Sequence, residues 1–216
     1  MIIINNGSLK ELLLAAKTGP FMQAEIVSLT GKGKLRVTCN WLYSSLNCDP
    51  NDSSVFLWQF NKIDDQHISL SPINSCINKT IYVSIRDDIG YILQVQAPYS
   101  ADWITAVGRD EIIGFKLQGT FIAQFTGFNG KFVALNDNAE SHDNHSGFRV
   151  RSIGDTFNQN AQWFVAIRKS LQPHIQFIGA QFDFESIQNE LKNLDIALDH
   201  NLVEQVVSQL KSQDFP

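Results

Sequence analysis

Three things are scarce in this chain: cysteine, long hydrophobic runs and blocks of charge of one sign. No segment of its 216 residues approaches the ~20 consecutive apolar residues that a membrane-spanning helix requires. The net charge is −5, and basic residues gather only in the short spot Lys32, Lys34 and Arg36. Sequence-independent binding of nucleic acid needs a broad basic face, so we expect no nucleic-acid partner. A hydrophobic content of 44% with 18% charged residues is typical of a folded globular protein.

The three cysteines, Cys39, Cys48 and Cys76, are an odd number, so a complete framework of disulfides is excluded. Cys39 and Cys48 would be able to bridge two strands in an exported protein, but free buried thiols are the favoured interpretation. The N-terminal run 1–6 is short and lacks a leading positive charge, so it does not resemble a secretory signal. We therefore expect synthesis in the cytoplasm, with non-classical release left open.

Recognisable catalytic motifs are also missing. The chain has no G-x-S-x-G elbow, no phosphate-binding glycine loop, no H-E-x-x-H and no C-x-x-C. The nearest approach to a metal site is His142-Asp143-Asn144-His145, but zinc sites usually need three or four suitable ligands. We interpret this run as a solvated polar loop. The expectation is a protein that is not an enzyme and that holds no metal and no cofactor.

What the sequence does contain is a pattern that occurs three times. In each copy a glycine leads into an apolar strand, and a strand rich in aromatic residues follows. The glycine-led strands are 33–37, 90–95 and 130–135, and the aromatic-rich strands are 55–60, 112–117 and 162–167. From Gly33 to Phe60 is 27 residues, and from Gly90 to Leu117 is again 27. Repetition of one supersecondary unit predicts architecture more firmly than any single element does.

Each copy also offers two further short strands with period-two alternation. The first strands of the copies are expected at 25–29, 81–85 and 120–125, and the third strands at 42–46, 103–107 and 148–151. The piece 67–71 is an additional strand between the first two copies. In the third copy, ten extra polar residues at 138–147 form an insertion. Twelve strands in three units predict a sheet that closes on itself, because closure satisfies the strand edges.

This arrangement resembles the β-trefoil superfamily, and its rhythm is most similar to the fascin-like and agglutinin-like branches. The run 130–135, Gly-Lys-Phe-Val-Ala-Leu, is the best single match. The resemblance implies a mainly β fold, a β-trefoil of three four-strand repeats at about 24–65, 79–118 and 119–169, within a domain at 24–172. The Q-x-W triplet of ricin-like lectins is absent, since Gln162 and Trp163 are adjacent. A galactose-type site is therefore not carried over.

Two segments outside the repeats are expected to be helical. In the lead-in 1–23, Ser8 and Glu11 have the spacing of a capping box, and Gly19-Pro20 ends the helix that plugs one end of the core. In the tail 173–216, an apolar stripe predicts one long amphipathic helix or a helical hairpin. The stripe comprises Phe184, Ile187, Leu191, Leu194, Leu198, Leu202, Val206 and Leu210. We expect this helix to bind a partner, to form a homo-oligomer or to pack on its own barrel.

Binding residues are better represented than catalytic ones. A sugar ring is recognised by an aromatic face together with planar carboxylate or amide groups. The candidates, taken from the second and third copies, are Asp87, Asp88, Tyr99, Trp103, Phe128, Asn129, Asp137, Asn138, His142 and His145. By contrast, Trp58, Phe115, Trp163 and Phe164 are expected in the core. The trefoil resemblance implies a possible sugar pocket in each repeat.

The leading hypothesis is therefore a non-catalytic, lectin-like module that binds a glycan or a glycoprotein. The alternative is a protein-interaction scaffold that uses the trefoil surface and the amphipathic tail. A third interpretation is a component of a toxin or inhibitor system.

Overall fold

The computed structural model describes residues 1–4, 9–39, 44–73, 82–86, 92–96, 115–119, 122–126, 132–142, 145–153 and 159–177. The elements in chain order are β1 (Ile2–Ile4), α1 (Leu9–Ala15), β2 (Gly19–Ser28), β3 (Lys34–Cys39), β4 (Ser44–Asp49), β5 (Trp58–Lys62), β6 (His67–Pro72), β7 (Tyr82–Arg86), β8 (Ile92–Gln96), β9 (Phe115–Gly119), β10 (Ile122–Thr126), β11 (Phe132–Leu135), β12 (Glu140–His142), β13 (His145–Ile153), the 3₁₀ turn η3 (Gln159–Ala161), β14 (Trp163–Ser170) and β15 (Ile175–Phe177). This content is mainly β, as predicted. Among these residues, no helix has the length and hydropathy that a membrane span requires.

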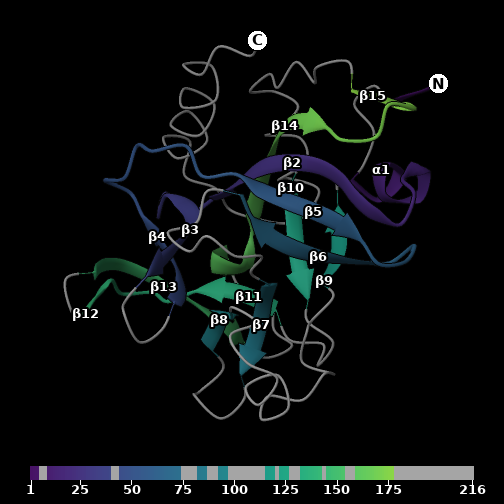
Figure 1. Ribbon diagram of the computed structural model, residues 1–216. Coiled ribbons are helices and arrows are strands. Elements are labelled where there is room, and N and C mark those ends of the chain that lie inside the picture. Colours follow the sequence, from purple (N-terminus) through teal and green to yellow (C-terminus); the bar gives the residue numbers. More distant parts are fainter. Residues whose placement is uncertain are drawn as a thin grey trace.

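The strands close into a barrel. β2 pairs with β5, β5 with β6, β6 with β9, β9 with β10, and β10 with β14, all antiparallel. The circuit closes because β14 pairs with β2 over the register Trp163↔Ser28 to Ser170↔Met22, with a bulge between Ile167 and Lys169. Figure 1 shows these strands around the upper part of the molecule. The closed sheet that the repeats predicted is confirmed.

The remaining long strands form three hairpins that cap the barrel. The hairpins are β3–β4, β7–β8 and β11–β13. They also pair with one another, since β4 meets β8, β13 meets β4, and β13 meets β8. A second closed circuit, through β2, β3, β4, β13, β11, β10 and β14, joins this cap to the barrel. The hairpins lie together in the lower half of Figure 1.

In the second copy, the strands predicted from the sequence pattern are shifted by one strand relative to those in the structure. β6 is a barrel strand between β5 and β9, so the piece at 67–71 is not an extra strand but the first strand of that copy. The segment expected there, 81–85, forms β7 of the hairpin, and the glycine-led segment 90–95 forms β8, its partner. The expected third strand at 103–107 lies outside the described residues. A short apolar strand after a glycine looks the same in either position, so the equal 27-residue spacing misled the alignment of the copies.

The core assignment of the large aromatic residues is confirmed where their side chains are described. Trp58, Trp163 and Phe164 are fully buried. Trp58 Nε1 donates to the carbonyl oxygen of Leu35 at 2.9 Å, and Trp163 Nε1 donates to that of Val133 at 3.0 Å. Each bond runs from the fourth strand of a copy to its second strand, so copies one and three share the same internal contact. The side chain of Phe115 lies outside the described residues.

Aromatic rings also fill the interior of the barrel. The ring centroids of Phe21 on β2 and Phe60 on β5 are 6.3 Å apart in an edge-to-face arrangement. Phe60 lies 6.4 Å from Phe125 on β10, a strand that does not pair with β5. This second contact therefore crosses the interior. All three rings are buried, so the barrel is packed rather than hollow.

An ion-pair triad lies on the seam where the barrel closes. Glu25 on β2 is 1% exposed, and its Oε1 is 2.8 Å from Lys34 Nζ on β3. Arg168 on β14 donates from Nε to Glu25 Oε2 at 2.8 Å and also approaches the same oxygen through its terminal nitrogen. One buried carboxylate thus joins β2, β3 and β14, and its charge is compensated by two cations.

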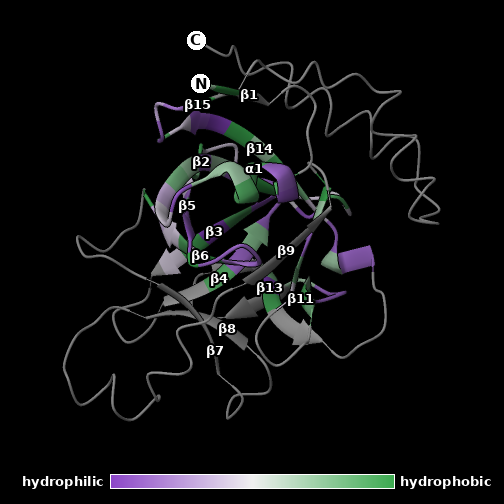
Figure 2. Cartoon of the chain, turned by 90° about the vertical axis from the view of Figure 1, so that its right-hand side faces the viewer, coloured by the Kyte–Doolittle hydropathy of each residue, from purple (hydrophilic) through white to green (hydrophobic). Residues whose placement is uncertain are grey.

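The predicted N-terminal helix is confirmed as α1. Leu9, Leu12 and Leu13 are buried against the core, whereas the chain presents hydrophilic residues on the other side of the helix, as the mixed colours of α1 in Figure 2 show. β2 then begins at Gly19, ahead of the expected Ala24. The helix therefore plugs the core, as the spacing of its leucines predicted.

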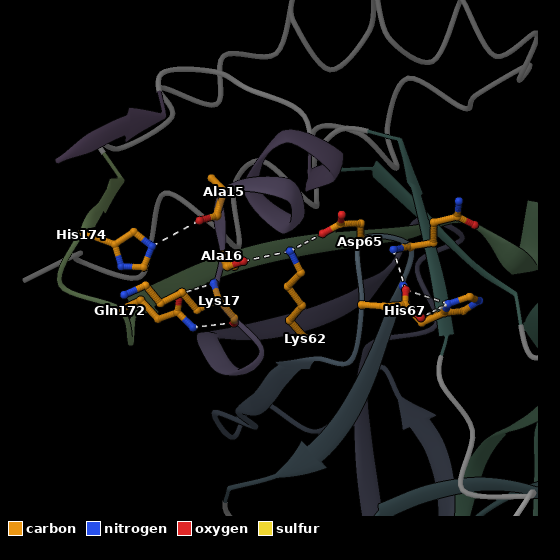
Figure 3. A network of polar contacts seen from close by, with 10 residues as sticks. Ala15, Ala16, Lys17, Lys62, Asp65, His67, Gln172 and His174 are labelled. Carbon is orange, nitrogen blue, oxygen red and sulfur yellow. Dashed lines mark hydrogen bonds and ion pairs between the residues drawn. The ribbon is translucent and has the colours of Figure 1, made fainter.

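Side chains from the barrel hold the C-terminal end of α1 (Figure 3). Lys62 Nζ, which is buried, donates to the carbonyl oxygen of Ala16 at 2.9 Å and lies 2.6 Å from Asp65 Oδ1. His174 Nε2 is 3.2 Å from the carbonyl oxygen of Ala15. Gln172 receives the backbone N–H of Lys17 and donates to its carbonyl oxygen, both at 2.8 Å. The carbonyl group of Ala15 at the end of the helix, and those of Ala16 and Lys17 just after it, therefore have side-chain partners.

The two terminal segments of the described chain also meet. β1 pairs with β15 in parallel, with Ile2 opposite Ile175 and Ile4 opposite Phe177. The two strands lie side by side at the top of Figure 2. The expected helical tail, with its stripe from Phe184 to Leu210, lies outside the described residues.

The Glu25 triad leads to a prediction about stability. Glu25→Gln removes the only carboxylate of the triad and leaves Lys34 and Arg168 mostly buried without it, so we expect the free energy of unfolding to fall by about 3 kcal/mol. Lys34→Met is the comparison, because it preserves the Arg168 contacts and is expected to cost less. Urea unfolding followed by tryptophan fluorescence measures both. If both variants lost the same unfolding free energy, the prediction that Glu25 stabilises both cations would be wrong.

Candidate functional site

The basic spot of the sequence is neutralised by acidic partners within the fold. Arg36 on β3 donates from Nε to Asn47 Oδ1 at 2.9 Å, lies 3.1 Å from Asp49 Oδ2, and contacts Asp52. Hydrogen bonds from Ser54, together with Arg36, lower the pKa of Asp52 to about 2. Since Lys34 pairs with Glu25, two of the three cations are already engaged by carboxylates. The spot stabilises the hairpin β3–β4 and the closure seam.

The third cation organises a polar cluster that joins three distant segments. Lys32 Nζ donates to the carbonyl oxygen of Asn136 and to Asn160 Oδ1, both at 2.7 Å, and lies 4.9 Å from the ring centroid of Phe148. Asn160 Nδ2 in turn donates to Asp137 Oδ1 at 2.6 Å. Burial lowers the pKa of Lys32, and the charge of Asp137 partly opposes that shift. We call Lys32, Asn136, Asp137, Phe148 and Asn160 the Lys32 cluster.

The Lys32 cluster presents an oriented carboxylate to solvent. Asn160 on η3 is only 7% exposed, whereas Asp137 and its neighbour Asn138 are exposed in the turn that follows β11. The side-chain amide of the buried Asn160 donates a hydrogen bond to the exposed carboxylate of Asp137. The Asp137 side chain therefore has less conformational freedom than an ordinary surface aspartate. A carboxylate beside an amide offers acceptors and donors for a ligand rich in hydroxyl groups.

A buried amide of unusual character lies next to the cluster. Gln162 is 2% exposed, and neither its Oε1 nor its Nε2 has a hydrogen-bond partner among the described residues. Its backbone is held on both sides, by Gln159 and by Leu29. Buried amides normally have partners, so Gln162 marks the base of this region as a place of incomplete polar satisfaction.

The structure describes only some of the predicted sugar-binding residues. Asp137 and Asn138 lie at the surface as expected, and the backbones of His142 and His145 face each other in β12 and β13. The interpretation of 142–145 as a loop is therefore wrong for His142 and His145, which are paired residues of β12 and β13. Outside the described residues lie Asp87, Asp88, Tyr99, Trp103, Phe128 and Asn129.

The topology also changes which turns correspond. Asp87-Asp88 connects β7 to β8, the second and third strands of its copy, and the turn at 136–139 leaves β11 in the same position. By their order in the chain these two segments correspond, whereas Phe128-Asn129, between β10 and β11, corresponds to the segment with Lys32 between β2 and β3. The sequence pattern does not reveal the roles of Lys32 and Asn160, since a buried asparagine in a polar segment gives no periodic signal.

Among the cysteines, Cys48 is free and buried, and burial raises the pKa of its thiol. Cys48 lies opposite Leu35, whereas Cys39 lies opposite Ser44 at the other end of the hairpin. The favoured interpretation of a free buried thiol is confirmed for Cys48. Among the residues whose side chains are described, no group of three His, Cys, Asp or Glu is placed to hold a metal ion.

Comparison with known proteins supports the fold and no more. No protein-family model matches the chain, and no curated protein sequence matches it. A solved structure of Cry35Ab1 is similar with a TM-score of 0.50 and 14% identity, over 78% of this chain and 41% of that chain. The designed threefold-symmetric protein ThreeFoil matches with a TM-score of 0.45 and 14% identity, over 67% of this chain and 97% of that one.

A structure of lysenin in complex with phosphocholine has a TM-score of 0.47 and 11% identity, over 70% of this chain and 46% of that chain. The chain thus spans less than half of the lysenin and Cry35Ab1 chains. The likeness to Cry35Ab1 agrees with the closed barrel and its cap of three hairpins, and both are consistent with a trefoil-type fold.

The Lys32 cluster predicts that Asn160 stabilises the protein. Asn160→Ala removes the partner of both Lys32 and Asp137, and we expect it to lower the free energy of unfolding by about 2 kcal/mol. The matched control is Asn138→Ala, an exposed asparagine whose replacement is expected to change it by less than about 0.5 kcal/mol. Urea unfolding compares the two. Similar values for both variants would contradict the cluster.

The Arg36 network predicts a dependence on pH. The pKa of Asp52 is about 2 in the folded protein, below its ordinary value of ~3.9, so its charge contributes stability above about pH 4 and loses it as the pH falls toward 2. The difference in unfolding free energy between the natural chain and Asp52→Asn should therefore shrink over this range. Urea unfolding at several pH values measures this difference. A difference that stayed constant with pH would contradict a lowered pKa of Asp52.

Proposed function

We propose that this chain is a non-catalytic carbohydrate-binding module whose binding surface lies on the turns of the hairpin cap. The observation that carries the proposal is the 2.6 Å hydrogen bond by which the buried Asn160 fixes the exposed carboxylate of Asp137. Sugars are bound by planar polar groups that are held in place before the ligand arrives, because a fixed group loses little entropy on binding.

The charge balance around the Lys32 cluster favours a neutral ligand. Lys32 donates two hydrogen bonds within the protein and lies over the ring of Phe148, so its charge is committed to the fold. Asp137 carries a negative charge at the surface and would repel an acidic ligand. Hydroxyl groups, in contrast, donate well to a carboxylate and exchange bonds with the amide of Asn138.

The arrangement of the cap supports a shared surface. The pairings β8–β13 and β4–β13 bring the hairpins of all three copies into contact. In the sequence, Asp87-Asp88 follow β7 as Asp137-Asn138 follow β11, so carboxylate groups recur after the second strand of two copies. The aromatic face that the proposal needs is assigned to Tyr99 and Trp103, which follow β8 in the sequence.

The experiment is a glycan-array screen with the full chain, followed by titration of a responsive glycan. We expect Asp137→Ala and Tyr99→Ala each to weaken binding roughly 10- to 100-fold, as a lost charged hydrogen bond or a lost ring contact does. Asp137 is an exposed residue in a turn, so circular dichroism should show an unchanged barrel for Asp137→Ala, and the same measurement checks the fold of Tyr99→Ala.

The matched control is Asp65→Asn, which alters another exposed aspartate, in the β5–β6 turn beside α1. It should leave the glycan titration unchanged. Titrations of the Asp137 and Tyr99 variants that overlay the natural chain would remove this surface from consideration, and a purified chain that binds no glycan would remove the function.

A further inference from the structure

The hairpin β12–β13 places three residues of metal-binding types, two histidines and one glutamate, on one face. The register pairs His142 with His145 and Glu140 with Gly147, and it is regular between them. Successive residues of a strand lie on opposite faces, and residues directly opposite each other share a face. Glu140, His142, His145 and Gly147 therefore share one face, whereas Ser141 and Ser146 lie on the other.

The spacing on that face suits a small cation. Directly opposed residues of antiparallel strands have Cβ atoms about 4.5–5.5 Å apart, and neighbours two positions along a strand are about 7 Å apart. Imidazole and carboxylate ligands bind zinc at about 2.0–2.2 Å, so groups at these positions can converge on one ion. Glycine opposite Glu140 adds no side chain that would compete for the space.

The base of the hairpin is anchored to the barrel cap. Phe148 and Arg149 on β13 pair with Cys48 and Asn47 on β4. Gly147 has φ +150°, and a Cβ at its position would lie 2.6 Å from the carbonyl oxygen of Cys48, so only glycine fits. A ligand set on a strand pair with a fixed base is held more precisely than one on a loop.

The other described histidines already have roles in the fold. His67 contacts Asp64, and His174 contacts the carbonyl oxygen of Ala15. β12 pairs only with β13 among the described strands, which leaves the outer edge of the hairpin unpaired; in Figure 1 it lies at the periphery of the molecule. Two imidazoles with one carboxylate form a ligand set typical of zinc and its neighbours among the first-row metals.

We propose that this face of the β12–β13 hairpin, where Glu140, His142 and His145 lie together, is a binding site for one divalent transition-metal ion such as Zn²⁺. Three protein ligands leave a fourth position to water, as in open zinc sites. The proposal does not depend on carbohydrate binding, and its test requires no glycan.

The test is calorimetric titration of the full, chelator-treated chain with zinc chloride. We expect one ion per chain, with His142→Asn and His145→Asn each weakening the affinity at least tenfold and Glu140→Gln weakening it less. The control His67→Asn preserves all three residues of the site and should titrate as the natural chain does. Zinc should also raise the urea midpoint of the natural chain and of His67→Asn but not that of His142→Asn, since an ion that binds only the folded state stabilises it.

Three results would overturn the site: no zinc binding by the natural chain, hairpin variants that titrate like it, or loss of binding in His67→Asn. If Glu140→Gln left the affinity for zinc unchanged, Glu140 would not be a ligand of the site. Circular dichroism of each variant separates loss of the site from loss of the fold.

Discussion

Everything in this structure depends on the pairing of β14 with β2. The two strands lie about 140 residues apart in the sequence, and only their pairing turns the sheet into a barrel. The same seam holds the buried carboxylate of Glu25, which ties Arg168 on one side to Lys34 on the other. Closure satisfies edges that would otherwise invite aggregation, and it provides the core into which α1 packs. A buried ion pair adds little net stability, but breaking one is costly, so the triad opposes any opening of the seam.

The closed barrel determines where a ligand can bind. Aromatic rings fill its interior, so the surface available for function is the cap and its turns. On the cap, Lys34 and Arg36 form ion pairs with carboxylates of the fold. Lys32 connects η3 to the turn after β11 through its hydrogen bonds to Asn160 and Asn136. In the described part of the Lys32 cluster and its neighbouring turn, Asp137 and Asn138 present a carboxylate and an amide to solvent. Under the proposed function, this arrangement of charges favours hydroxyl-rich ligands over anionic ones, although the sequence has a basic spot.

The sequence predicted the closed β architecture and most strands of the first and third copies, because their glycines, alternation and tryptophans coincide. Trp58 and Trp163 make the same hydrogen bond in the two copies, and this common contact is the physical basis of the repeat. The second copy has Phe115 where the others have tryptophan, so its strands could be aligned only by spacing, and spacing misplaced them. Asp137 was predictable as a polar turn residue. Asn160 was not, because the value of a buried amide depends on partners that lie more than 20 residues away in the chain.

The two proposed sites are neighbours in the sequence, and both arise where the third copy departs from the first. The turn at 136–139 leads into the ten-residue insertion at 138–147, which contains β12 and the first residues of β13. In a pseudo-symmetric barrel the core positions are constrained in every copy, since each faces the same packed interior. An insertion in one turn escapes that constraint and can acquire polar groups without cost to the core. Gly147 shows how such an insertion is still joined to the cap, because its close approach to Cys48 lets β13 continue from the added hairpin into the original strand. Function is therefore expected where the threefold symmetry fails.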